Sequence, residues 1–171
     1  YPTDSPTQVE YLINDSRTRF YFAEDEEQLD KVLEVRDRTP SLEKIIILDM
    51  EGLRHLDDAM CVSFDELLEL GKAHDELHTQ MWCDEIDQAS PEDLMVLTYT
   101  SGTTGPPKGA MITQKNMLFM MQTLQRCYGI RPSDEQLAFP PLAHVAGRMF
   151  YTFAMIESCS VINLVESLET I

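Results

Sequence analysis

A loop rich in glycine and hydroxyl side chains, with a single lysine, follows the apolar run at residues 94–97. Its hydroxyl donors are Thr100, Ser101, Thr103 and Thr104, and its glycines are Gly102, Gly105 and Gly109. Glycine permits positive φ and lets a ligand oxygen approach successive backbone N–H groups. Lys108, on an arm stiffened by Pro106 and Pro107, adds a mobile positive charge that can offset charge on a leaving pyrophosphate. The pattern predicts a phosphate-binding loop at 98–110, although it lacks the Gly-Lys-Ser/Thr ending of a Walker A motif.

The run from Tyr99 to Gly109 resembles the phosphate loop of the adenylate-forming superfamily, which comprises acyl-CoA synthetases, peptide-synthetase adenylation domains and luciferases. Further stretches resemble the long-chain fatty-acid branch of that superfamily. They are Tyr1-Pro2-Thr3 with residues 11–16, the segment 141–144 followed by Arg148, and the ending 165–170. The resemblance extends over nearly the whole chain. A turn without function is therefore a poor account of the glycine-rich segment.

The resemblance implies that the parent enzyme is a long-chain fatty acid CoA ligase. The carboxylate would attack the α-phosphate of ATP, pyrophosphate would leave, and coenzyme A would then displace AMP from the acyl-adenylate. Lys108 and Thr104 would be catalytic, with the Thr104 hydroxyl near Mg²⁺, and His144 would position the substrate at the wall between acyl pocket and adenylate. The residues expected to hold the nucleotide are Thr100, Ser101, Gly102, Thr103, Thr104, Gly105 and Lys108. The expected ligands are ATP, Mg²⁺, coenzyme A and a fatty acid.

Three positions depart from the family pattern. Gly147 stands where relatives have a glutamate before the arginine, Gln114 stands where they commonly have histidine, and Pro140 replaces a more usual leucine. These changes leave the phosphate chemistry intact, but they prevent the shape of the acyl pocket and the preferred chain length from being carried over.

The resemblance further implies that residues 1–171 are an internal part of the large N-terminal AMP-binding domain, without its two ends and without the mobile C-terminal domain. The Tyr-Gly-x-Thr-Glu segment, the ribose-binding aspartate and the C-terminal lysine of relatives are not found here. We therefore expect these residues alone to be inactive. Two alternatives stay open: adenylation of a short-chain, aryl or amino acid, and a non-catalytic nucleotide-binding remnant.

Composition limits the partners. With 30 acidic and 13 basic side chains the formal charge is −17, which repels nucleic acids and anionic membrane surfaces at long range. No stretch has the ~20 apolar residues that span a bilayer, so no transmembrane segment is expected, while peripheral membrane contact stays open. The cysteines are widely separated, which predicts neither a zinc site nor disulfides and fits the cytoplasm. They are Cys61, Cys83, Cys127 and Cys159.

The elements that carry the loop alternate between strand and helix. Helices are expected over 5–14, opened by a Ser5 capping box, and over 26–36, 64–73, 113–127 and 145–158; strands are expected over 19–23, 44–48, 94–99, 137–139 and 161–165. Residues 57–62 are expected to be irregular, and residues 79–93 are expected to be an exposed connection that ends in a short capped turn at 90–93. The pattern predicts an α/β fold: one mainly parallel sheet with helices on both faces and the phosphate loop at the carboxyl end of a strand.

Two other sequence patterns are not assigned to a functional site. His74 and His78 have metal-ligand spacing on a helix, but the zinc-protease glutamate and a third ligand are missing, so an ordinary helix end is expected. The methionines after the loop are expected mainly to fill core space between helix and sheet, namely Met111, Met117, Met120 and Met121.

Overall fold

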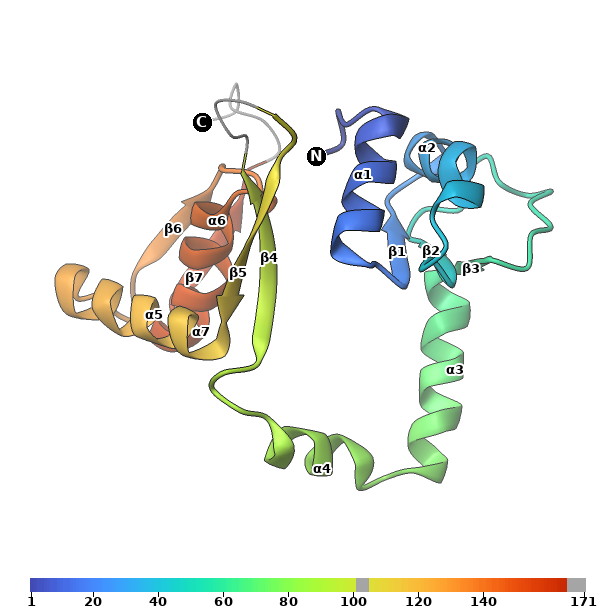
Figure 1. Ribbon diagram of the computed structural model, residues 1–171. Helices are drawn as coiled ribbons and strands as arrows, with labels where there is room; N and C mark the ends of the chain where they lie inside the picture. The colour runs from blue at the N-terminus through green and yellow to red at the C-terminus, as the bar shows by residue number, and fades with distance from the viewer. Residues whose placement is uncertain (101–104, 166–171) are drawn as a thin grey trace. The chain divides into compact units, whose positions relative to one another are not determined.

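The computed structural model describes residues 1–100 and 105–165, and the chain divides into two compact units, Tyr1–Gln88 and Ala89–Ile171 (Figure 1). Each unit has its own hydrogen-bonded strands. The α/β class expected from the sequence is confirmed. Most strand pairs are parallel, namely β1–β2, β2–β3 and β6–β7, whereas β4–β5 is antiparallel.

The first unit is built on a parallel sheet of order β1-β2-β3, with β1 at Phe20–Ala23, β2 at Lys44–Ile47 and β3 at Cys61–Ser63. Helix α2 (Glu26–Val35) and the 3₁₀ turn η1 (Arg36–Arg38) connect β1 to β2, which makes a βαβ crossover. Ile45 and Ile47 join the core under the helices, and Ile46 on the opposite side of β2 is buried as well. A strand buried on both faces was expected at 44–48, and this expectation is confirmed.

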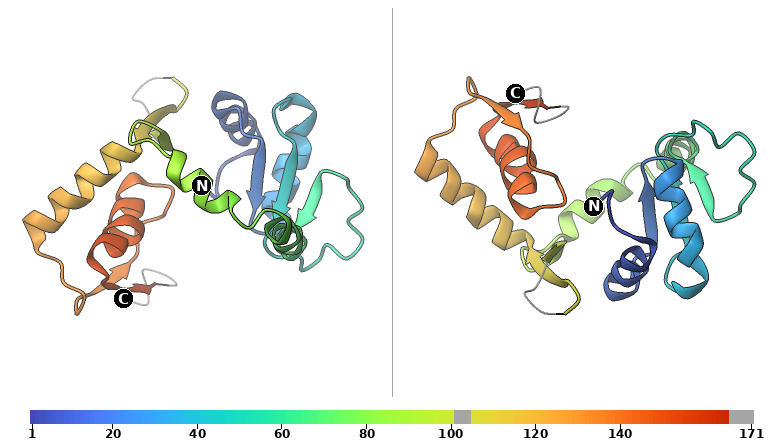
Figure 2. Two further views of the ribbon diagram at one scale, coloured as in Figure 1. Left: turned by 90° about the horizontal axis from the view of Figure 1, so that it is seen from below. Right: turned by 90° about the horizontal axis from the view of Figure 1, so that it is seen from above.

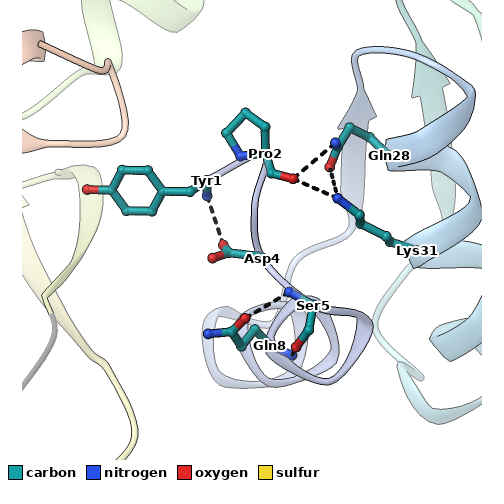
Figure 3. Close-up of polar contacts among 7 residues, drawn as sticks. All are labelled: Tyr1, Pro2, Asp4, Ser5, Gln8, Gln28 and Lys31. Carbon is teal, nitrogen blue, oxygen red and sulfur yellow. Dashed lines mark hydrogen bonds and ion pairs between the residues drawn. The ribbon is translucent and has the colours of Figure 1, made fainter.

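Helix α1 (Pro6–Ser16) starts at the predicted capping box (Figure 3). The Gln8 amide donates to Ser5 Oγ at 3.3 Å, and the Ser5 amide donates to Gln8 Oε1 at 2.8 Å. The segment before the helix is also held, because the Pro2 carbonyl accepts hydrogen bonds from Gln28 Nε2 and Lys31 Nζ of α2. These bonds satisfy backbone groups that a helix start leaves unpaired and join the two helices.

Strand β3 corrects one expectation, because residues 57–62 were expected to be irregular. Asp58 organises the approach to this strand: it forms an ion pair with Arg36 and accepts the Met60 amide at 2.9 Å. The Arg36 guanidinium, helped by the Met60 amide, holds the pKa of Asp58 below its ordinary value. Burial raises the pKa of the Cys61 thiol. A three-residue strand carries too little periodicity to be recognised from its sequence alone.

Helix α3 (Phe64–Leu77) follows and is longer than the expected 64–73, and α4 (Met81–Gln88) lies within the expected connection 79–93. Neither helix has a buried residue, so the exposed character predicted for 79–93 is confirmed, and the structure adds a helix within that connection. The acidic, amphipathic sequence of α4 is compatible with a helix but carries no cap signal that would have distinguished it.

The second unit contains the hairpin of β4 (Leu94–Thr100) and β5 (Lys108–Thr113), followed by helix α5 (Gln114–Tyr128). Strands β6 (Glu135–Ala138) and β7 (Val161–Leu164) pair in parallel. Between them run α6 (Val145–Gly147), the π-helical turn η2 (Arg148–Phe153) and α7 (Ala154–Ser158), beside α5 in every view (Figure 1 and Figure 2). Met117 and Met121 of α5 are buried, as expected for core methionines, whereas Met111 and Met120 are exposed.

One sheet was expected, but the described strands form three separate sheets. The pairing of β4 with β5 has a simple cause. Only residues 101–107 connect these strands, and so short a connection permits an antiparallel hairpin but not the crossover that parallel pairing requires. Strand β5 itself was not anticipated, because its residues were assigned to the phosphate loop and to the start of the next helix.

Candidate nucleotide site and His144 segment

The β4–β5 hairpin carries the predicted phosphate loop at its tip (Figure 1). Thr100 is the register partner of Lys108, and Tyr99 is the partner of Gly109, so the two ends of the loop are hydrogen-bonded strands. Gly105 has φ +90°, a conformation that L side chains rarely adopt, as expected for a glycine in this loop. Four of the expected nucleotide-binding residues lie outside the described residues: Ser101, Gly102, Thr103 and Thr104.

Gly109 is needed for a reason other than the one inferred from the sequence. Its φ is not positive, so it does not serve the loop through left-handed backbone. Instead, a Cβ on Gly109 would lie 3.1 Å from Tyr99 Cζ and 3.3 Å from Tyr99 Oη. The missing side chain makes room for the aromatic ring of the residue directly across the hairpin. The cross-strand partner of a glycine could not be known before the register was known.

Lys108 also differs from expectation, because it begins strand β5 rather than lying on a loop arm. Its backbone is therefore fixed by the ladder, while its side chain is exposed. No side chain in residues 1–100 and 105–165 forms an ion pair or hydrogen bond with its ammonium group. In a chain of net charge −17 this leaves a cation available to an anionic ligand at the hairpin tip.

The base of the hairpin is closed by the turn at residues 90–93. The Ser90 amide donates to Asp93 Oδ2 at 2.7 Å, which confirms the capped turn expected there. Across the base, the Gln114 amide donates to the Asp93 carbonyl at 3.0 Å, and the Lys115 amide donates to the Pro91 carbonyl at 2.8 Å. Lys115 Nζ also pairs with Glu92 at 3.0 Å. The chain thus enters β4 and leaves β5 at one hydrogen-bonded point.

His144 lies on a different segment, between β6 and the helical run that starts at Val145. It is the N-cap residue of α6: its Nδ1 accepts the Ala146 amide at 3.1 Å, and its own amide donates to the Pro141 carbonyl at 2.9 Å. The imidazole is otherwise exposed. The structure therefore brings Thr100 and Lys108 together on the hairpin, and it places His144 on a separate loop of the same unit.

His74 and His78 are not part of the candidate site. The rings of His74 and His78, at the end of α3, lie 4.4 Å apart between centroids. Over the ranges 1–100 and 105–165 there is no group of three or more His, Cys, Asp or Glu residues that could hold a metal ion. In the same residues, no helix combines the length and apolar character that crossing a membrane requires.

The chain belongs to the AMP-binding enzyme family, which matches residues 1–168. Among curated relatives, the long-chain-fatty-acid–CoA ligase ACSBG1 of Rattus norvegicus is 30% identical over 161 residues, covering 92% of this chain and 22% of the relative. The long-chain-fatty-acid–CoA ligase 1 of Cavia porcellus is 29% identical over 156 residues, covering 85% of this chain and 21% of the relative. The chain thus spans about a fifth of the length of these relatives.

Solved structures of adenylate-forming enzymes are similar to most of this chain. The anthranilate CoA ligase AuaEII in complex with anthranoyl-AMP has a TM-score of 0.65 at 24% identity and covers 94% of this chain and 28% of that one. ATP-bound MatB from Rhodopseudomonas palustris has a TM-score of 0.65 at 16% identity and covers 95% of this chain and 28% of that one. These similarities confirm that the chain has the fold of adenylate-forming enzymes.

Proposed function

We propose that the protein carrying this chain activates a long-chain fatty acid in two steps. The carboxylate attacks the α-phosphate of ATP and expels pyrophosphate, and the thiol of coenzyme A then displaces AMP to give the acyl-CoA. Family membership supports the adenylating half of this proposal, and the names of the similar ligases support the choice of acid and thiol. A cytoplasmic location fits these substrates and stays a prediction.

The observation that carries the proposal is the pairing of Thr100 with Lys108 at the tip of the hairpin. The hydrogen bonds between β4 and β5 fix the backbone of Lys108 at the start of β5. The Lys108 side chain is exposed and has no acidic partner in the described residues. Lys108 would follow the negative charge that develops on the leaving pyrophosphate. The hydroxyl and backbone N–H groups from Thr100 to Gly105 would bind the β- and γ-phosphates, as donors in such a loop can.

Mg²⁺ would enter with the phosphates of ATP. The donors of the loop are hydroxyls, amides and one lysine, which suit phosphate oxygens but form no metal cage, and the described residues hold no acidic or histidine cluster for a metal. The hydroxyl of Thr104 is the ligand we propose from this loop. When bound, the ion neutralises phosphate charge beyond what one lysine can offset.

His144 is proposed to contact the acid substrate. It is exposed, and its position is fixed by the helix start that it caps. A fixed polar group beside an otherwise apolar segment is suited to orient a carboxylate whose chain is apolar.

The test is acid-dependent exchange of pyrophosphate into ATP by the intact protein, with a panel of long-chain, short-chain, aryl and amino acids. Lys108→Ala should lower kcat on the order of 100-fold, the effect of removing one transition-state charge contact. Lys115→Ala is the matched control, because it removes a lysine from an exposed ion pair at the base of the same hairpin. Exchange with none of the acids, or equal activity of the two variants, would refute the proposal.

A further inference from the structure

Gly147 lies against the backbone that precedes His144. A Cβ built on Gly147 would stand 2.5 Å from the carbonyl oxygen of Pro141 and 3.1 Å from that of Pro140. The Pro141 oxygen already accepts the His144 amide at 2.9 Å, so it cannot move aside without losing a hydrogen bond. Gly147 is itself buried in the first helical turn. A Cβ at position 147 would therefore require the Pro140–Pro141 backbone to shift.

The close approach at Gly147 is one of several contacts that tie the ends of segment 141–148 together. Arg148 Nε donates to the Leu142 carbonyl at 2.8 Å, and the Arg148 amide donates to the His144 carbonyl at 3.3 Å. Within this loop, His144 Nδ1 accepts the Ala146 amide at 3.1 Å. One imidazole nitrogen therefore has a backbone partner, the Ala146 amide. The position of this amide depends on the close packing of Gly147 against residues 140–141.

An acceptor role for Nδ1 determines the tautomer of the neutral ring. Because Nδ1 offers its lone pair to the Ala146 amide, the proton of neutral imidazole resides on Nε2. The other tautomer would place two donors face to face and leave the Ala146 amide without its cap. His144 is exposed, so the Nε2–H group is available as a donor to a ligand.

We propose that Gly147 is a positioning residue that holds His144 as an Nε2–H donor for the carboxylate of the acid substrate. The inference rests on the proposed function, because that function supplies the ligand of His144. Gly147 touches neither substrate nor nucleotide in this proposal. It acts by allowing the helix start to approach the Pro140–Pro141 backbone, which fixes the hydrogen bond at Nδ1.

The first measurement is the tautomer of His144 in the intact protein labelled with ¹⁵N in histidine, at alkaline pH where free imidazole is neutral. The His144→Asn variant assigns the signal. The wild-type spectrum should show a protonated Nε2 and an unprotonated Nδ1, and Gly147→Ala should shift His144 toward a mixture of tautomers. Gly71→Ala is the matched control, because a Cβ there meets nothing within 4 Å.

The second measurement is the KM of the acid in pyrophosphate exchange. Gly147→Ala and His144→Asn should each raise it about tenfold, the loss of one hydrogen bond to a charged group, with the KM of ATP unchanged. Asparagine keeps an acceptor near Nδ1 but has no donor near Nε2. His144→Gln places an amide N–H near the Nε2 position and should retain a KM close to that of the wild type.

A proton on Nδ1 in the wild-type protein, or an unaltered tautomer in Gly147→Ala, overturns the proposal. If Gly147→Ala does not fold, the two His144 variants provide the test. Equal KM values of the acid for His144→Asn and His144→Gln also overturn the proposal. Absence of acid-dependent exchange in the wild type would instead refute the proposed function, and the tautomer spectra would still decide whether Gly147 positions His144.

Discussion

The ring of Tyr99 lies over Gly109, its register partner across the β4–β5 hairpin, with Tyr99 Cζ 3.1 Å from where a Cβ of Gly109 would be. Both residues adjoin the pair Thr100 and Lys108 at the hairpin tip. The packing of one aromatic side chain on a bare backbone therefore supports the geometry from which the lysine projects.

Gly109→Ala should destabilise the hairpin by about 1 kcal/mol, because the ring must move by a few tenths of an ångström to admit the methyl group. The variant should also lower the kcat of pyrophosphate exchange, since the neighbouring Lys108 shares the strand. Denaturant unfolding and exchange kinetics measure the two effects. In a Tyr99→Ala background the same glycine substitution should cost little, and an equal cost in both backgrounds would show that the ring is not responsible.

Gly105→Ala should destabilise the protein by about 1–2 kcal/mol for a different reason. Nothing lies within 4 Å of the position of its Cβ, so the cost is conformational, from φ +90°. Gly71→Ala, in the open face of α3 and without positive φ, should be neutral or stabilising. The two variants compared by thermal unfolding separate backbone strain from a general effect of added methyl groups.

Thr113→Ala should weaken helix α5 by about 1 kcal/mol, because Thr113 Oγ1 accepts the Asn116 amide and Asn116 Oδ1 accepts the Thr113 amide. Hydrogen exchange of the first-turn amides of α5 reports the change. Thr123→Ala is the control, since Thr123 lies within the same helix and its hydroxyl donates to the Phe119 carbonyl rather than capping the helix start. Equal exchange in both variants would contradict a capping role.

Acid should loosen the approach to β3. The pKa of Asp58 is depressed in the folded protein, chiefly by Arg36, so its contribution to stability is present above the ordinary carboxyl pKa of about 4 and is lost as the pH falls through the lower folded value. Hydrogen exchange of the Met60 and Cys61 amides, corrected for intrinsic pH dependence, should rise over that interval. Asp58→Asn should remove this pH dependence, and Asp57→Asn, at an exposed neighbour, should retain it.

Local signals in the sequence predicted much of the fold. The Ser5 capping box, the apolar run of β2 and the Ser90–Asp93 turn are each specified by residues close together in the chain, and each is present. The features that were missed depend on distant partners. Strand β3 exists because it pairs with β2, and the requirement for Gly109 arises from a ring across the hairpin.

The candidate site follows the same division. The phosphate loop was predicted from residue type and order, and the role of His144 was predicted from the resemblance to the family. The strand position of Lys108 and the tight packing of Gly147 required the backbone to be placed. In the sequence, Gly147 is recognisable only as a departure from the family pattern. A steric requirement of this kind leaves no periodic or compositional trace in one sequence.

The bonds from Gln114 to Asp93 and from Lys115 to Pro91 have an evolutionary consequence. Because the chain enters and leaves the hairpin at one hydrogen-bonded point, we expect that residues 101–107 can be lengthened, shortened or exchanged without shifting helix α5 or the turn before β4. If the proposed phosphate site lies at this tip, its ligand preference can diverge while the rest of the unit stays unchanged.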